Sequence, residues 1–323
     1  MARRTASALA TLSAIVTASV MFTAQNANAD LVMYCIGSGG PVTVPSDLYV
    51  PAGESCSLDR TTITGNVRVA AGANLIVKGG TINGEVRVAS DGYLDTTDTR
   101  IDGEVNLAAG GFGIYMRNTD TGRVVVAPKG SATIAGFLFV EQGSKVDGNI
   151  QAGVGEVHVA DTEVTGNIST SAADYTDLHG SFVDGTVSVL NNATGSVVCG
   201  SAVQGKATFA GNQGGVQLGP NGGLDSCASG GYFARDVVIS NTTGRSSLDD
   251  NIVNGKLELT ANNPASEVAT NNRIRGGIVG DHSTPAAARA AAAAGTRGTG
   301  LQRSQARLAA ATGEAAVSGK ARL

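Results

Sequence analysis

The chain has 323 residues and a formal net charge of −4, and it combines 45 glycines with seven phenylalanines, six tyrosines and no tryptophan. An apolar fraction of 42% with only 15% charged residues excludes a wholly disordered chain, and glycine without a Gly-X-Y pattern excludes collagen. Beyond residue 25 no segment is long and apolar enough to span a bilayer. So much glycine with so few aromatic residues favours a repetitive β-structure with many turns.

The N-terminal segment 1–29 has the features of a signal peptide. Arg3 and Arg4 precede an apolar stretch from about residue 6 to 22, and Ala27-Asn28-Ala29 fits the small-x-small rule for cleavage. We therefore expect a mature chain from Asp30 that is secreted, extracellular and without a transmembrane anchor after processing.

The cysteines indicate the same compartment. An even number of cysteines after a signal peptide predicts two disulfides, for which three pairings are open. Sequence-local pairing, Cys35 with Cys56 and Cys199 with Cys227, is favoured because the first pair is about one repeat apart. A cysteine metal site is the rival interpretation, but there is no CxxC motif and no Cys/His cluster.

Residues 30–58 precede the regular repeats and predict an N-terminal cap and first coil. Alternating apolar and polar residues there, such as Val42, Val44, Leu48 and Val50, resemble the repeats that follow. We expect the Cys35–Cys56 bond to hold this cap and to cover the N-terminal edge of the sheets.

A short internal repeat decides the fold class. The segments 63–69, 82–88 and 101–107 share the pattern Ile-x-Gly-x-Val-x-Val or Leu, with Gly65, Gly84 and Gly103 spaced 19 apart. The pattern returns with irregular spacing as far as Gly276. Apolar residues at every second position predict short strands with one buried face, and we expect each glycine on that inward side because a Cβ would crowd the core.

Nineteen residues are too few for a βαβ unit and match one coil of a β-solenoid. Residues 41–281 therefore predict an all-β fold of about twelve parallel coils, each about 4.8 Å from the next, with the regular parallel β-helix at 59–282. The less regular residues 211–250 predict a loop tied by Cys199–Cys227.

The repeated Ile-x-Gly-x-Val-x-Val motif resembles the coils of right-handed parallel β-helix proteins. It is similar to the bactofilin repeat and to exported pectate-lyase-like proteins, including secreted proteins of actinobacteria. The resemblance covers roughly residues 41–281 and implies a right-handed coil in a secreted bacterial protein.

Residues 283–323 differ from the rest in composition, since they are rich in alanine and arginine. Between residues 285 and 323 there are six basic residues and one acidic residue. The apolar faces are thin, so we expect a disordered tail that loosely covers the C-terminal end of the solenoid.

One acidic cluster is a candidate metal site. Glu85 and Glu104 are one repeat apart, so they stack as like charges on adjacent strands, and Asp102 lies close by. A bound Ca²⁺ ion could offset this repulsion. Salt bridges to the nearby arginines Arg68, Arg87 and Arg123 are the alternative, and no other cofactor is expected.

Other candidate side chains are few. Tyr93 and Tyr115 fall at similar places in successive coils, so they could form a ligand patch or pack within the fold. His158 points outward from a strand, and the sequence around it contains no second histidine or cysteine. Asp120, Asp249 and His179 lack the spacing that β-helix hydrolases need.

No convergent catalytic set is therefore predicted. The expected function is an exported, non-catalytic, structural, adhesive or polymer-binding protein whose partner is a cell-envelope or extracellular polysaccharide. The alternative is a polysaccharide lyase or glycoside hydrolase of pectate-lyase-like fold. Nucleic acid is not an expected partner, because residues 30–284 carry a net negative charge.

Overall fold

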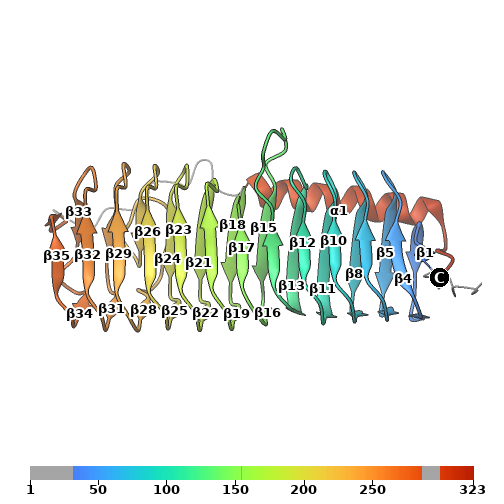
Figure 1. Ribbon diagram of the computed structural model, residues 1–323, viewed down its shortest axis with the longest axis horizontal. Coiled ribbons are helices and arrows are strands. Elements are labelled where there is room, and N and C mark those ends of the chain that lie inside the picture. The colour runs from blue at the N-terminus through green and yellow to red at the C-terminus, as the bar shows by residue number, and fades with distance from the viewer. Residues whose placement is uncertain (1–31, 154, 286–298) are drawn as a thin grey trace, which may run out of the picture. The chain divides into compact units, whose positions relative to one another are not determined.

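The computed structural model describes residues 32–153, 155–285 and 299–323. They form a parallel β-solenoid, and Figure 1 shows its coils stacked in chain order from β1 to β35. The predicted fold class is confirmed, while the right-handed sense of the coil stays a prediction. The predicted signal peptide, residues 1–29, lies outside the described residues.

Each coil contributes strands to up to three parallel sheets. The first sheet contains β1 (Val32–Tyr34), β4 (Asp47–Val50), β7 (Val67–Val69), β10 (Val86–Val88), β12 (Val105–Leu107), β14 (Val124–Val126), β17 (Ile150–Ala152), β20 (Ile168–Ser171), β23 (Val187–Leu190), β26 (Ala207–Ala210), β29 (Val237–Ser240), β32 (Leu257–Thr260) and β35 (Ile278–Gly280). The second sheet contains β2 (Gly37–Gly39), β5 (Ser55–Asp59), β8 (Asn74–Lys78), β11 (Tyr93–Ile101), β13 (Gly113–Thr121), β15 (Phe137–Glu141), β18 (Glu156–Ala160), β21 (Tyr175–His179), β24 (Ser196–Cys199), β27 (Val216–Leu218), β30 (Ser247–Leu248), β33 (Ser266–Val268) and β36 (His282–Ser283). The third sheet contains the ends of β11 and β13 together with β3 (Thr43–Val44), β6 (Thr62–Ile63), β9 (Thr81–Ile82), β16 (Lys145–Val146), β19 (Glu163–Val164), β22 (Phe182–Val183), β25 (Ala202–Val203), β28 (Tyr232–Phe233), β31 (Ile252–Val253) and β34 (Arg273–Ile274).

The first sheet has 13 strands, so there is one coil more than the expected twelve. The additional coil begins at β1, ahead of the residues from which the repeat was counted. Residues 32–58 form strands that pair in register with the strands that follow, as when Leu48 of β4 lies opposite Val67 of β7.

Inward-facing side chains stack from coil to coil and form the core. Val67, Val86 and Val105 are opposite one another on successive strands, and all three are fully buried. This arrangement is the reason for the sequence repeat, because each coil buries its apolar side chains only against its neighbours.

The repeated glycine lies elsewhere than expected. Each motif divides into two short strands on different sheets, so that β9 ends at Ile82, β10 begins at Val86 and Gly84 forms the corner between them. A Cβ on Gly84 would lie 2.6 Å from the carbonyl oxygen of Gly65 in the preceding coil. Glycine is required by contact between the backbones of successive coils, and not by crowding within the core.

Two longer coils carry loops. In the first sheet, Val124 pairs with Ile150 and Ala207 pairs with Val237, and these two steps span more of the chain than any other step in that sheet. The additional residues form loops at 127–136 and 219–231. The second of these is the loop predicted by the less regular sequence around it.

The expected disordered tail is wrong for residues 299–323. Thr299–Ser318 forms α1, which lies beside the N-terminal coils (Figure 1). The buried face of α1 consists of the small residues Gly300, Ser304, Ala311 and Ala315, so the helix axis can approach the second sheet closely. Composition alone underestimates such a helix, because tertiary packing and not apolar bulk stabilises it.

The end of the chain also lies at the opposite end of the solenoid from that expected. Ser38 of β2 pairs in parallel with Lys320: the Ser38 amide donates to Gly319 O (2.8 Å) and the Ala321 amide donates to Ser38 O (2.8 Å). Residues 319–321 therefore cover part of the N-terminal edge of the second sheet, which otherwise exposes backbone groups.

Candidate functional site

Both predicted disulfides are confirmed. Cys35 is bonded to Cys56 and Cys199 to Cys227, with Cα–Cα distances of 5.6 and 5.5 Å, and no cysteine is free. The first bond joins successive coils, and the second attaches the loop at 219–231 to β24. Two disulfides are consistent with an extracellular protein.

The acidic candidate residues each have an arginine partner. Glu85 lies 2.7 Å from Arg87, Asp102 lies 2.6 Å from Arg100, and Glu104 forms an ion pair with Arg123. These arginines therefore offset the repulsion between the carboxylates, as the salt-bridge alternative predicted. Calcium binding by Glu85, Asp102 and Glu104 stays a prediction.

Tyr93 and Tyr115 do not form a solvent-accessible patch. Tyr93 is fully buried and Tyr115 is 5% exposed, since both pack in an aromatic cluster with Phe137 and Phe139. Phe112 and Leu308 of α1 pack against this cluster. The packing alternative therefore describes these two tyrosines, whose rings are not accessible to a ligand in this structure.

The phenols in this cluster are bound to carboxylates. Tyr93 Oη donates to Asp95 Oδ2 (2.6 Å), and Arg117 forms an ion pair with the same carboxylate. Burial, followed by the charge of Asp95, raises the pKa of Tyr93. Burial also raises the pKa of Asp95, although Tyr93 and Arg117 oppose that shift.

Tyr115 gives a prediction for high pH. Its Oη donates to Glu141 Oε2 (2.8 Å), and burial together with this carboxylate raises its pKa to about 12 from the ordinary value of about 10. Unfolded chains lose this proton near pH 10 while the native state retains it, so the stability contributed by Tyr115 decreases as the pH rises from 10 to 12. In a spectrophotometric titration, Tyr115→Phe should remove absorbance change only near pH 12; loss of the change near pH 10 would contradict the prediction.

The outer face of the second sheet carries a group of side chains that sequence reasoning did not assemble. His158 of β18 lies directly opposite Asp177 of β21, and His179 follows at the next outward position of the same strand. The potential ligand atoms of these three residues lie within 4.8 Å of one another, and the imidazole centroids are 5.2 Å apart. One nitrogen of each ring and a carboxylate oxygen could therefore hold a metal ion.

A signal for this group was present in the sequence. Asp177 follows His158 by one full repeat, and His179 lies two positions beyond Asp177, which returns the side chain to the same face. Applying the repeat to every polar outward residue, and not only to the acidic ones, would have predicted the juxtaposition.

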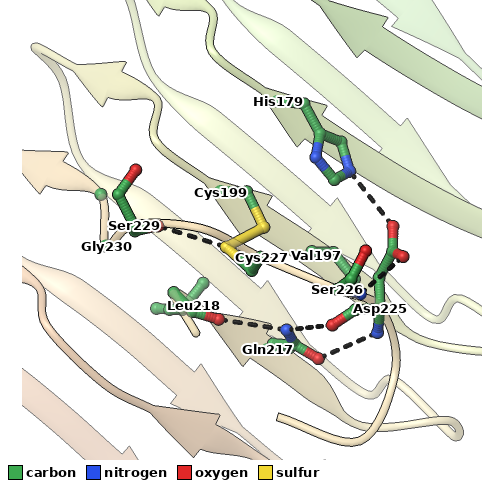
Figure 2. Close-up of a disulfide and its surroundings, with 12 residues drawn as sticks. His179, Val197, Cys199, Gln217, Leu218, Asp225, Ser226, Cys227, Ser229 and Gly230 are labelled. Carbon is green, nitrogen blue, oxygen red and sulfur yellow. Dashed lines mark hydrogen bonds and ion pairs between the residues drawn. A yellow bond between two sulfur atoms is a disulfide. The ribbon is translucent and has the colours of Figure 1, made fainter. Parts of the chain in front are cut away.

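The loop at 219–231 extends this group (Figure 2). Asp225 places Oδ2 3.5 Å from His179 Nε2, on a loop that Cys227 attaches to Cys199. Gln217 also holds the loop: its Oε1 accepts from the amides of Leu224 (2.9 Å) and Asp225 (3.1 Å), and its Nε2 donates to Asp225 O (2.8 Å). Asp225 is thus positioned by covalent and polar restraints.

Residues that resemble hydrolase elements are not brought together. Asp120 lies on β13 opposite Lys145, whereas Asp249 follows β30 and accepts hydrogen bonds from Asn221 and Asn271. Neither belongs to the group around His179.

A second candidate surface lies at the N-terminal end of the first sheet. The outward-facing side chains at the centre of successive strands form a row there, which we call the outer row, and this surface is its start. Tyr34 and Tyr49 are opposite one another, with ring centroids 5.4 Å apart and nearly perpendicular planes, and residue Tyr34 is 60% exposed. They line a shallow pocket of about 290 Å³ together with Asp47 and Arg68.

In the part of the chain that the structure describes, no helix is long and apolar enough to cross a membrane. No family model matches the chain, and no curated protein or solved structure matches it significantly.

Proposed function

We propose that the protein is an exported, non-catalytic β-solenoid that binds an acidic polysaccharide of the cell envelope or extracellular space. The predicted signal peptide and the two disulfides support export into an oxidising compartment. The proposed binding surface is the outer row of the first sheet.

The observation that carries this proposal is the start of that row. Tyr34, Tyr49, Arg68 and Arg87 follow one another on successive strands. Arg68 and Arg87 are like charges directly opposite each other, an arrangement that destabilises a sheet unless an anion offsets it. Glu85 offsets the charge of Arg87, whereas Arg68 is exposed beside the two rings.

The rest of the row is suited to an extended polymer. The next six outward residues are mostly uncharged and polar, and they recur once per coil at about 4.8 Å, before the row ends in Val238, Glu258 and Val279. The six residues are Asn106, Val125, Gln151, Ser169, Ser188 and Thr208. A polymer with acidic groups could contact the arginines at one end and hydrogen-bond along the six coils that follow.

Co-sedimentation of the mature chain with insoluble acidic and neutral polysaccharides tests the proposal. We expect binding to acidic polymers that weakens with salt, because exposed charges are screened. The Tyr34→Ala/Tyr49→Ala chain should bind at least about tenfold more weakly, equivalent to about 1.4 kcal/mol. Tyr232→Ala, which removes a partly exposed tyrosine of the third sheet, is the matched control. Equal binding by all three chains, or binding by none, would refute the proposal.

A second candidate function is cleavage of a polysaccharide, as in the pectate-lyase-like proteins that the coil motif resembles. The observation that favours it is the group of His158, Asp177 and His179 beside the loop at 219–231. Release of reducing ends or unsaturated uronates by the mature chain, and its loss in His179→Ala, would support cleavage over binding alone.

A further inference from the structure

The group on β18 and β21 has the composition of a transition-metal site. Among the described residues it is the one set of three or more histidine, cysteine or carboxylate side chains whose potential ligand atoms gather within 4.8 Å. Two imidazole nitrogens and one carboxylate oxygen form a ligand set typical of zinc, whereas calcium prefers oxygen ligands throughout.

Its charges also favour a cation. Asp177 is only 3% exposed, and its Oδ1 accepts from the Val197 amide (3.0 Å). Glu141 Oε1 lies 3.6 Å from His158 Nε2, and Asp225 Oδ2 lies 3.5 Å from His179 Nε2. Three carboxylates thus surround two imidazoles, and a divalent ion bound here would offset this negative charge.

The two outer carboxylates have a second effect. A carboxylate beside a metal-binding histidine fixes the orientation and tautomer of the ring and makes it a stronger ligand. Glu141 can do this for His158 and Asp225 for His179. The two histidine side chains are 27% and 24% exposed, so an ion can reach the group from solvent.

We infer that His158, Asp177 and His179 bind one Zn²⁺ ion, with Glu141 and Asp225 as outer carboxylates. Three protein ligands leave a fourth position for water or an anionic group of a ligand. Because the Cys199–Cys227 bond and Gln217 together hold the loop that carries Asp225, reduction of this disulfide is expected to weaken the placement of this outer carboxylate. This site lies on the second sheet, so it is independent of the polysaccharide surface proposed on the first.

Titration of the untagged, EDTA-treated and dialysed mature chain with ZnCl₂ tests the inference, with calorimetry and metal analysis as readouts. We expect one equivalent to bind. His158→Ala and His179→Ala should each lower the affinity by more than about 100-fold, because loss of an outer partner alone costs roughly 10–100-fold. Asp225→Asn should fall within that outer-partner range.

Two further variants control for loss of folding and for zinc binding outside the group. Asp177→Asn can keep the hydrogen bond from the Val197 amide, so it should retain the circular dichroism spectrum of the wild type while losing zinc affinity. His282→Ala removes the remaining histidine, which is exposed and outside the group, and should bind zinc normally. Absence of stoichiometric binding, or affinity that survives in both His158→Ala and His179→Ala, would overturn the inference.

Discussion

A chain that ends at residue 298 is expected to form the same coils, to unfold at a much lower temperature than the full chain and to self-associate. The deletion removes α1 and the segment that pairs with β2. It exposes the aromatic cluster of Tyr93, Phe137 and Phe139. Each large apolar side chain that becomes exposed costs about 1.5–3 kcal/mol.

The same deletion removes three hydrogen-bond partners of a buried carboxylate, which keeps the hydrogen bond from Tyr175 Oη (2.9 Å). Glu156 is 5% exposed, and it accepts hydrogen bonds from the Gly300 amide (2.9 Å), Thr299 Oγ1 (3.0 Å) and Arg303 (3.0 Å). Removing one partner of a buried ion pair costs about 3–5 kcal/mol where the charge stays buried, and less here because removal of α1 lets water reach the carboxylate. Together with exposure of the aromatic side chains, we expect the free energy of unfolding to fall by more than about 5 kcal/mol. Thermal unfolding would measure this loss, dye binding the exposed apolar surface and light scattering the self-association.

Two chains separate these contributions. A chain that ends at Ser318 keeps α1 and loses only the strand partner of Ser38, so it should retain most of the stability while exposing the edge of β2. Arg303→Ala keeps the helix and removes the guanidinium from Glu156. Equal unfolding temperatures for the full chain and the chain ending at residue 298 would show that α1 contributes nothing to the fold.

The position of the tail shows where sequence reasoning stopped. The alanine-rich composition indicates only that residues 299–318 have helix propensity. The surface that holds the helix is built from Phe112, Phe137 and Glu156, which belong to different coils. Arg307 completes the attachment by donating to Asn74 Oδ1 (2.6 Å) and to the Asp91 carbonyl (3.1 Å). No repeat in the sequence relates Arg303 and Arg307 to their partners on the coils, so the docking of α1 could not be predicted.

The coils themselves were predictable because their signal is repeated. Val67, Val86 and Val105 occupy equivalent buried positions in successive coils, so the sequence gives the same evidence for an inward-facing position several times. The disulfide Cys35–Cys56 followed from the same period. His158 and His179 are not part of a repeated motif. Their proximity could be deduced only by aligning successive coils through the repeat.

The largest effect of a single substitution is expected at the repeated corner glycines. A Cβ on Gly103 would lie 2.5 Å from Gly84 O and 2.6 Å from the amide nitrogen of Glu85, which are backbone atoms of the preceding coil. The next coil repeats the contact, since a Cβ on Gly122 would lie 2.7 Å from Gly103 O. Relieving such a contact requires two coils to separate, and the strands on both sides of the corner oppose this.

Gly103→Ala is therefore expected to destabilise the protein by about 3 kcal/mol or more, at the upper end of the cost of overpacking. Thermal or denaturant unfolding of the mature chain measures the change. Gly40→Ala is the matched control, because a Cβ there meets no atom within 4 Å and the backbone has no positive φ. Hydrogen exchange should show the loss of protection centred on β10 and β12, the strands that follow Gly84 and Gly103. If the two alanine variants unfold alike, the glycine repeat does not arise from contact between successive backbones, and a requirement of folding or export would have to explain it.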